Sequence, residues 1–133
     1  MNKNKKLVHH SLQDSPIPLY RAFQCAFEGV IHAIKTQRNF LIHLTCAIVA
    51  LIISYMLKLS HTEIAIIVIC IFVVFSFELV NTAIESIVDL VSPEWEQLAK
   101  HAKDCAAGSV LLVSIMSIVV ALHIFIPAIL KLF

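Results

Sequence analysis

The chain has 133 residues, of which 59% are hydrophobic and 14% are charged, against roughly 45–50% and 25% in soluble domains. So few polar side chains cannot cover the surface of a soluble domain, and only two glycines and four prolines exclude a disordered or collagen-like chain. The net charge of +1 gives no indication of nucleic-acid binding. The composition therefore favours a membrane protein with a single domain.

The N-terminal part of the chain changes character near residue 18. Residues 1–18 are polar and basic and include Pro16 and Pro18, which bar a helix across that point, so we expect a mobile arm. Residues 19–36 have apolar side chains at helical spacing, which predicts an amphipathic helix. This helix is too polar to span a bilayer, and we expect it to lie in the membrane interface. Packing of its apolar stripe on protein is the alternative.

Three long apolar segments follow, at about 40–57, 63–91 and 106–130. A membrane-spanning helix needs about 20 predominantly apolar residues. Each segment is therefore predicted to cross the bilayer, and the second has length to spare that a tilt or a protruding end must absorb. The predicted fold is an all-α membrane protein, in which an interfacial helix and three transmembrane helices form one domain over residues 19–133.

The positions of the lysines and arginines indicate how the chain is oriented in the membrane. Six of the ten precede the first span, whereas the turn after that span has Lys58 alone. The second connection has Lys100 and Lys103, and the C-terminal tail has Lys131. The positive-inside rule places the N-terminus and the second connection in the cytoplasm.

The second predicted span carries an acidic stripe. Glu78, Asn81, Glu85 and Asp89 are three, four and four residues apart, which places them on one helical face within an arc of about 80°. Each ionised carboxylate at membrane depth costs about 2.5–3.5 kcal/mol on insertion scales, and no lysine or arginine lies within the spans. A bound cation, protons or charge from the second connection must balance the stripe. Aligned carboxylates suit Mg²⁺, especially where phosphate oxygens complete its coordination.

The second connection supplies the nearest cations. Ser92 and Pro93 are predicted to start a short helix there, and Lys100 and Lys103 follow. Lysine beside carboxylates suited to Mg²⁺ is typical of sites that bind a polyphosphate. A solvated charged hairpin is the alternative for this segment. The two glycines form neither a P-loop nor a Gly-x-Gly-x-x-Gly motif, so any nucleotide chemistry must use another kind of site.

Two segments resemble the signature of the prokaryotic diacylglycerol kinase family, which includes the bacterial undecaprenol kinases. They read Glu78-Leu-Val-Asn-Thr-Ala-Ile-Glu-Ser-Ile-Val-Asp89 and Ala102-Lys-Asp-Cys-Ala-Ala-Gly-Ser-Val110. The resemblance covers the chain from about Tyr20 onward. It implies a homotrimeric kinase of the bacterial inner membrane that moves the γ-phosphoryl group of MgATP onto a lipid hydroxyl, with its active site on the cytoplasmic side.

The resemblance also implies roles for the acidic stripe. Glu78 matches the family's catalytic glutamate, which is the general base toward the lipid hydroxyl. Asn81 matches the polar residue beside that base, and Glu85 matches a ligand of the metal and the nucleotide. Asp89 matches a position of the motif and is expected to be a supporting polar residue.

The remaining expected site residues lie in and after the second connection. Lys103 and Asp104 match the family's nucleotide contacts, with the lysine on the phosphates. Glu94 and Glu96 fall where the family's loop touches the nucleotide. ATP is therefore the expected co-substrate, and Mg²⁺ is the expected cofactor.

The chain departs from the family pattern at one position. The family's first helix often presents a second metal-binding glutamate, and the matching residue here is Gln37. An amide oxygen can coordinate Mg²⁺ but brings no charge. Gln37 is therefore a candidate ligand of a metal site that is weaker or arranged differently.

Two other functions stay open beside the lipid kinase. A small transporter coupled to cations or protons would use the acidic stripe as its path, but residues 64–75 contain no ionisable side chain except that of Cys70, so the stripe opens only to the cytoplasm. The other possibility is a catalytically inactive accessory subunit, in which Gln37 replaces the family's metal-binding glutamate. Diacylglycerol and undecaprenol both present a primary hydroxyl, and either could be the substrate of a kinase.

Overall fold

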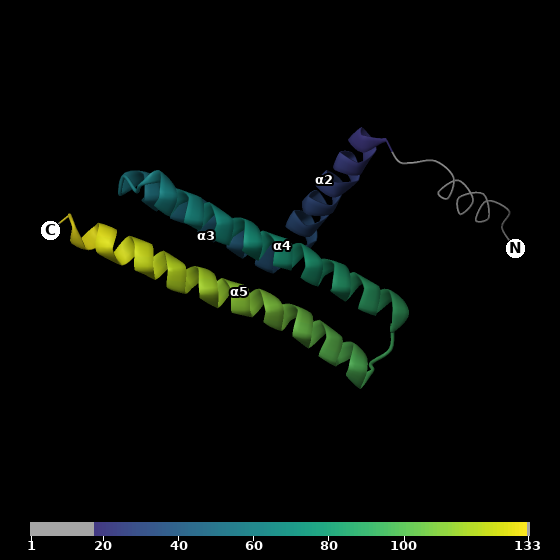
Figure 1. Ribbon diagram of the computed structural model, residues 1–133. Coiled ribbons are helices and arrows are strands. Elements are labelled where there is room, and N and C mark those ends of the chain that lie inside the picture. Colours follow the sequence, from purple (N-terminus) through teal and green to yellow (C-terminus); the bar gives the residue numbers. More distant parts are fainter. Residues whose placement is uncertain (1–17, 133) are drawn as a thin grey trace, which may run out of the picture. The chain divides into compact units, whose positions relative to one another are not determined.

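The computed structural model describes residues 18–132, which form four α-helices and contain no strand (Figure 1). The helices are α2 (Leu19–Thr36), α3 (Arg38–Met56), α4 (His61–Val91) and α5 (Gln97–Leu130). The prediction of an all-helical chain with three long apolar helices is confirmed. The expected mobile arm lies outside the described residues, apart from Pro18.

The chain consists of two compact units, and the boundary between them falls inside α2, between Ile31 and His32. In the first unit the described residues run from 18 to 31, and all side chains up to Gly29 are exposed. The second unit begins at His32 and contains α3, α4 and α5. All contacts discussed below belong to this three-helix unit.

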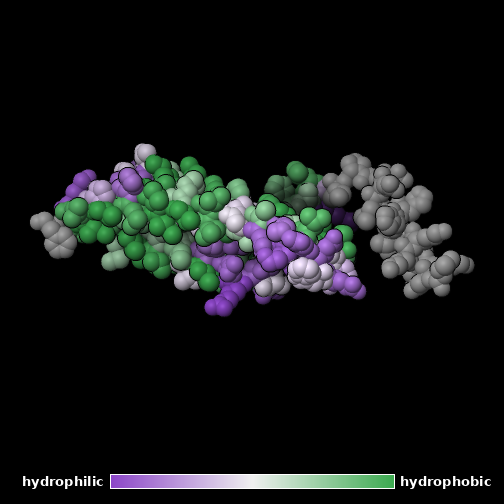
Figure 2. Space-filling model, turned by 90° about the horizontal axis from the view of Figure 1, so that it is seen from below, coloured by the Kyte–Doolittle hydropathy of each residue, from purple (hydrophilic) through white to green (hydrophobic). Residues whose placement is uncertain are grey.

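Helices α3, α4 and α5 have 19, 31 and 34 residues, and each is long and apolar enough to cross a membrane. Large apolar side chains are exposed along all three helices, among them Ile52, Phe72 and Leu112. On the face seen in Figure 2, apolar side chains cover much of the three-helix unit, and polar side chains gather toward the helix ends. Exposed apolar surface of this kind requires lipid rather than water around it.

A tight turn joins α3 to α4. Lys58 has a positive φ of 50°, and the Leu59 N–H donates to the Ser54 carbonyl at 3.1 Å, as in a Schellman motif. Ser60 then caps α4, because its N–H donates to the Glu63 carboxylate at 2.8 Å while its hydroxyl accepts from the Glu63 N–H. Reciprocal bonds of this type satisfy the free N–H groups of a helix start. The chain therefore reverses within a few residues.

The connection between α4 and α5 differs from its prediction. Ser92 does not start a helix. It is the C-cap of α4, and its N–H donates to the Val88 carbonyl at 2.8 Å. The reason is Pro93, whose ring disfavours the helical conformation in the residue before it. Helix α5 begins only at Gln97, so the third predicted span is the apolar part of a longer helix.

Helix α4 packs against both α3 and α5. The Phe40 and Phe75 rings stack with their centroids 5.0 Å apart, and the buried residues Ala47 of α3 and Ala106 of α5 are small. Small residues at helix contacts in membranes allow the backbones to approach closely. This packing places the polar face of α4 beside its two neighbours.

Candidate active site

The polar face of α4 becomes more exposed toward the C-terminal end of the helix. Glu78 is 1% exposed and Asn81 is 6% exposed. Glu85 is half-buried, and Asp89 is exposed. The polar face that the residue spacing predicts is thus continuous, and its side chains are buried at Glu78 and exposed at Asp89.

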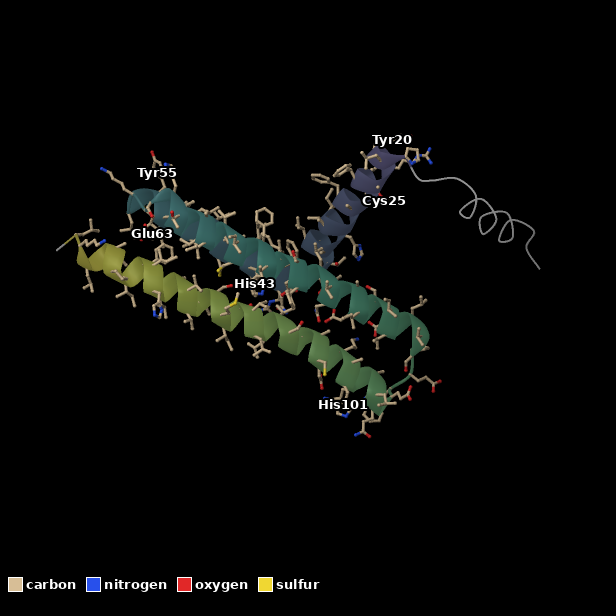
Figure 3. The ribbon with its side chains drawn as sticks, viewed as in Figure 1. Tyr20, Cys25, His43, Tyr55, Glu63 and His101 are labelled. Carbon is tan, nitrogen blue, oxygen red and sulfur yellow. The ribbon has the colours of Figure 1, made fainter. Side chains whose placement is uncertain are left out.

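Glu78 lies beside a histidine of α3. The distance between His43 Nε2 and Glu78 Oε1 is 3.1 Å. Their relative orientation falls short of a well-formed hydrogen bond, and Oε1 is a buried oxygen with no hydrogen-bond partner among the described residues. Figure 3 shows His43 about midway along the bundle, between the ribbons of α4 and α5 in this view. The contact joins two helices that are each long and apolar enough to cross a membrane.

Glu85 lies between two amide side chains. Asn81 Nδ2 donates to Glu85 Oε1 at 3.0 Å, and Gln37 Nε2 lies 3.5 Å from Glu85 Oε2. Gln37 is the N-cap of α3, and its side chain does not cap that helix. The structure therefore brings together Gln37 and Glu85, the two metal ligands expected from the sequence.

The side chains around Glu85 meet the requirements of a Mg²⁺ site only in part. Carboxylate and amide oxygens are suitable ligands, and the buried Asn81 Oδ1 has no hydrogen-bond partner among the described residues. Across residues 18–132, however, no three His, Cys, Asp or Glu side chains gather as a metal site. A Mg²⁺ ion would therefore need oxygens from elsewhere, and Mg²⁺ sites commonly take them from substrate phosphates and water.

The open end of the polar face carries two ion pairs. Lys103 Nζ of α5 lies 2.8 Å from Asp89 Oδ1 of α4, and Lys100 pairs with Asp104 on α5 itself at 2.5 Å. The acidic side chains of both pairs are more than half exposed, and exposed pairs of this kind contribute only about 0–1 kcal/mol. An incoming phosphate could replace an aspartate as the partner of a lysine at little cost.

The two loop glutamates lie apart from this arrangement. Glu94 and Glu96 are exposed, and the nearest polar contacts are those of the Ser92 hydroxyl, which donates to the Glu94 carbonyl at 3.2 Å and to Glu96 Oε2 at 3.4 Å. No contact between these carboxylates and Glu78 or Glu85 is present in the described part of the chain. The structure thus does not bring Glu94 and Glu96 to the polar face of α4.

An apolar cavity of about 440 Å³ lies between α3, α4 and α5. Most of its lining is aliphatic or aromatic, and its polar lining side chains include His43, Ser114 and Ser117. The Ser114 hydroxyl is buried and has no hydrogen-bond partner among residues 18–132. His43 both lines this cavity and contacts Glu78, so the cavity adjoins the buried end of the polar face.

Sequence reasoning missed His43 and Ser114 as members of the site. The sequence does contain a signal for His43, because its imidazole lies inside an otherwise apolar span. The buried Glu78 carboxylate of the next span needs a polar partner. Ser114 offers no such signal, because serine is common in membrane helices, where its hydroxyl can bond to the backbone of its own helix.

The comparisons with known proteins identify the family of the chain. The family model for prokaryotic diacylglycerol kinase matches residues 24–125. The undecaprenol kinase of Bacillus subtilis is 41% identical over 108 residues, which cover 81% of this chain and 88% of that protein. A diacylglycerol kinase of Synechocystis sp. is 40% identical over 129 residues, which cover 96% of this chain and 73% of that protein. These matches show that the chain belongs to the prokaryotic diacylglycerol kinase family, and they confirm the predicted membrane-embedded lipid kinase.

Proposed function

We propose that this lipid kinase transfers the γ-phosphoryl group of MgATP to the primary hydroxyl of a membrane lipid, either diacylglycerol or undecaprenol. The observation that carries the proposal is the polar face of α4. The Glu78 carboxylate is buried at one end of this face beside an apolar cavity, and an exposed lysine pairs with the other end. Lipid and nucleotide would thus approach the polar face of α4 at its two ends, the lipid at Glu78 and the nucleotide at Asp89.

Glu78 is the general base in this proposal. Its carboxylate is buried and contacts His43, which lines the apolar cavity, so a lipid hydroxyl could reach it from that side. His43 Nε2 faces Oε1 at 3.1 Å, so the other carboxylate oxygen is the one left to accept a proton from that hydroxyl. In phosphoryl transfer the protein mainly positions the reactants and neutralises charge, and a single base is enough for the proton.

The metal and the nucleotide bind further along the polar face. Glu85 and the amide oxygens of Asn81 and Gln37, once these amides turn from their N–H contacts with Glu85, would hold Mg²⁺, which supplies positive charge against the phosphates. Lys103 would leave Asp89 for a phosphate, which is a modest change for an exposed ion pair. Asp104, Glu94 and Glu96 are proposed nucleotide contacts on the strength of the resemblance.

The lipid's hydrocarbon chain would occupy the apolar cavity. Val120 lines the cavity, whereas its neighbour Val119 is 49% exposed and does not line it. We expect Val120→Phe to raise KM for the lipid about tenfold, because overpacking costs roughly 1–3 kcal/mol. KM for MgATP should stay unchanged. Val119→Phe is the matched control, since it adds the same ring at the same depth on the outer face. Equal lipid KM values for the two variants would contradict this location of the chain.

Membrane position and assembly complete the proposal. Helix α2 exposes large apolar side chains such as Leu19, Phe23 and Phe27, which supports a location in the interface of the bacterial inner membrane. Lys100 and Lys103 at the start of α5 support a cytoplasmic position for the nucleotide end. The homotrimer rests on the family resemblance, and a molecular mass measured in detergent would test it.

The activity and its orientation can be tested together with radiolabelled ATP. Purified chain in mixed micelles should transfer label to an added lipid only when Mg²⁺ is present. In sealed vesicles, ATP added outside should label lipid in inverted vesicles and not in right-side-out ones. Ion flux without labelling would indicate a transporter, and neither activity would indicate an inactive accessory subunit. Each of these two results would overturn the proposed function.

A further inference from the structure

His43 is the basic side chain that lies closest to the proposed base. Its Nε2 lies 3.1 Å from Glu78 Oε1, and the side chains of His43 and Glu78 are 23% and 2% exposed. The two lysines of α5 are paired elsewhere, at the open end of the polar face. No other ion pair to Glu78 is present in the described part of the chain. A carboxylate this deeply buried needs such a partner, because an unpaired buried charge is strongly unfavourable.

We propose that His43 is a positioning residue for Glu78, whose Nε2 holds the carboxylate in the orientation that accepts the lipid proton. The proposal rests on the proposed function, since it assumes that Glu78 is the base. His43 comes from α3 and Glu78 from α4, so the contact fixes the carboxylate against a second helix rather than leaving it to its own rotamers. Positioning of this kind matters because a misplacement of about 1 Å can cost roughly 10²-fold in rate.

The position of His43 also relates the base to the lipid. His43 lines the apolar cavity together with Ser114, and it touches Glu78 at the same time. A lipid chain in the cavity would therefore pass the imidazole before its hydroxyl reached the carboxylate. An apolar residue would fill this place with less cost in a membrane helix. The imidazole is thus better explained by its contact with Glu78 than by packing alone.

Two amide variants separate positioning from packing. The Nε2 atom of glutamine can occupy the place of the imidazole Nε2, whereas the shorter asparagine cannot reach it. We expect His43→Gln to keep kcat within about tenfold of the unchanged chain, and His43→Asn and His43→Leu to lose about 10²-fold. KM for MgATP should stay constant in all three, and so should thermal stability in detergent for the Gln and Asn pair. Equal kcat for the Gln and Asn variants, or an unchanged kcat for His43→Leu, would overturn the proposal.

A double variant tests whether His43 acts through Glu78. In a chain that already carries Glu78→Gln, His43→Leu should change the residual kcat by less than about threefold, because residues that act as a unit are not additive. A full further loss would show that His43 acts on something other than Glu78 and would overturn the proposal. Failure of the base assignment has a different signature, since Glu78→Gln alone would then turn over at nearly the normal rate. Failure of the proposed function would appear already in the unchanged chain, which would label no lipid.

Discussion

Replacement of Glu78 by glutamine is expected to lower kcat by about 10²–10⁴-fold, which is the usual contribution of a positioned general base. Glutamine keeps the shape of the side chain but cannot take the proton of the lipid hydroxyl. KM for MgATP should stay near its normal value, because the proposed nucleotide contacts lie toward Asp89 and Lys103. Steady-state kinetics in mixed micelles, with lipid and MgATP varied in turn, would measure both quantities.

Stability distinguishes chemistry from packing in this variant. Glu78 is a buried carboxylate within a helix that is long and apolar enough to cross a membrane, so its neutral replacement should insert and fold at least as well as the original. Lost turnover with unchanged or higher thermal stability would mark Glu78 as a residue kept for the reaction. Glu63→Gln is the matched control, since it makes the same change at the other end of α4 and keeps an acceptor for the Ser60 cap. Near-normal turnover of Glu78→Gln would remove the base assignment and make Asp89 the next candidate.

The helices were predictable because their signals are local. The apolar pattern after Pro18 predicts a helix over residues 19–36, and α2 occupies that range. The acidic face of α4 follows from helical geometry alone, and the graded burial from Glu78 to Asp89 agrees with it. The polar first turns of α5 were predicted as a separate short helix that starts at Ser92, whereas they continue into the third span as one helix from Gln97. An apolar run reports only the part of a helix that lies in lipid.

The contacts between helices were not predictable in the same way. The His43–Glu78 and Gln37–Glu85 pairs each join residues of α3 and α4. They depend on the register in which the two helices pack, which is set by the tight turn at Lys58 and by stacked rings such as that of Phe40. Spacing along one helix contains no information about that register. The family resemblance therefore pointed to Gln37, whereas His43 emerged only from the structure.

Replacement of Glu85 by glutamine is expected to raise the Mg²⁺ concentration needed for half-maximal activity by at least about tenfold, the lower range for loss of a supporting group at a metal site. Glu85 is the carboxylate that both Asn81 and Gln37 approach, so its charge is central to the proposed metal site. Glu63→Gln is the matched control, because Glu63 lies at the other end of α4 and keeps an acceptor for the Ser60 cap. Activity measured across a Mg²⁺ titration would compare the two variants. Unchanged Mg²⁺ dependence in Glu85→Gln would rule out its role as a metal ligand.

Replacement of Gln37 by glutamate tests the same proposed metal site by adding a carboxylate instead of removing one. Gln37 Nε2 lies 3.5 Å from Glu85 Oε2, so Gln37→Glu would place two carboxylates side by side. Without Mg²⁺ they should repel each other and lower the thermal stability of the chain. With Mg²⁺ the added charge should lower the half-saturating concentration or leave it unchanged, since a divalent cation neutralises both groups. Stabilisation by Mg²⁺ should therefore be larger in Gln37→Glu than in the unchanged chain. A collapse of activity at every Mg²⁺ concentration would show that the amide of Gln37 serves this kinase in a role other than metal binding.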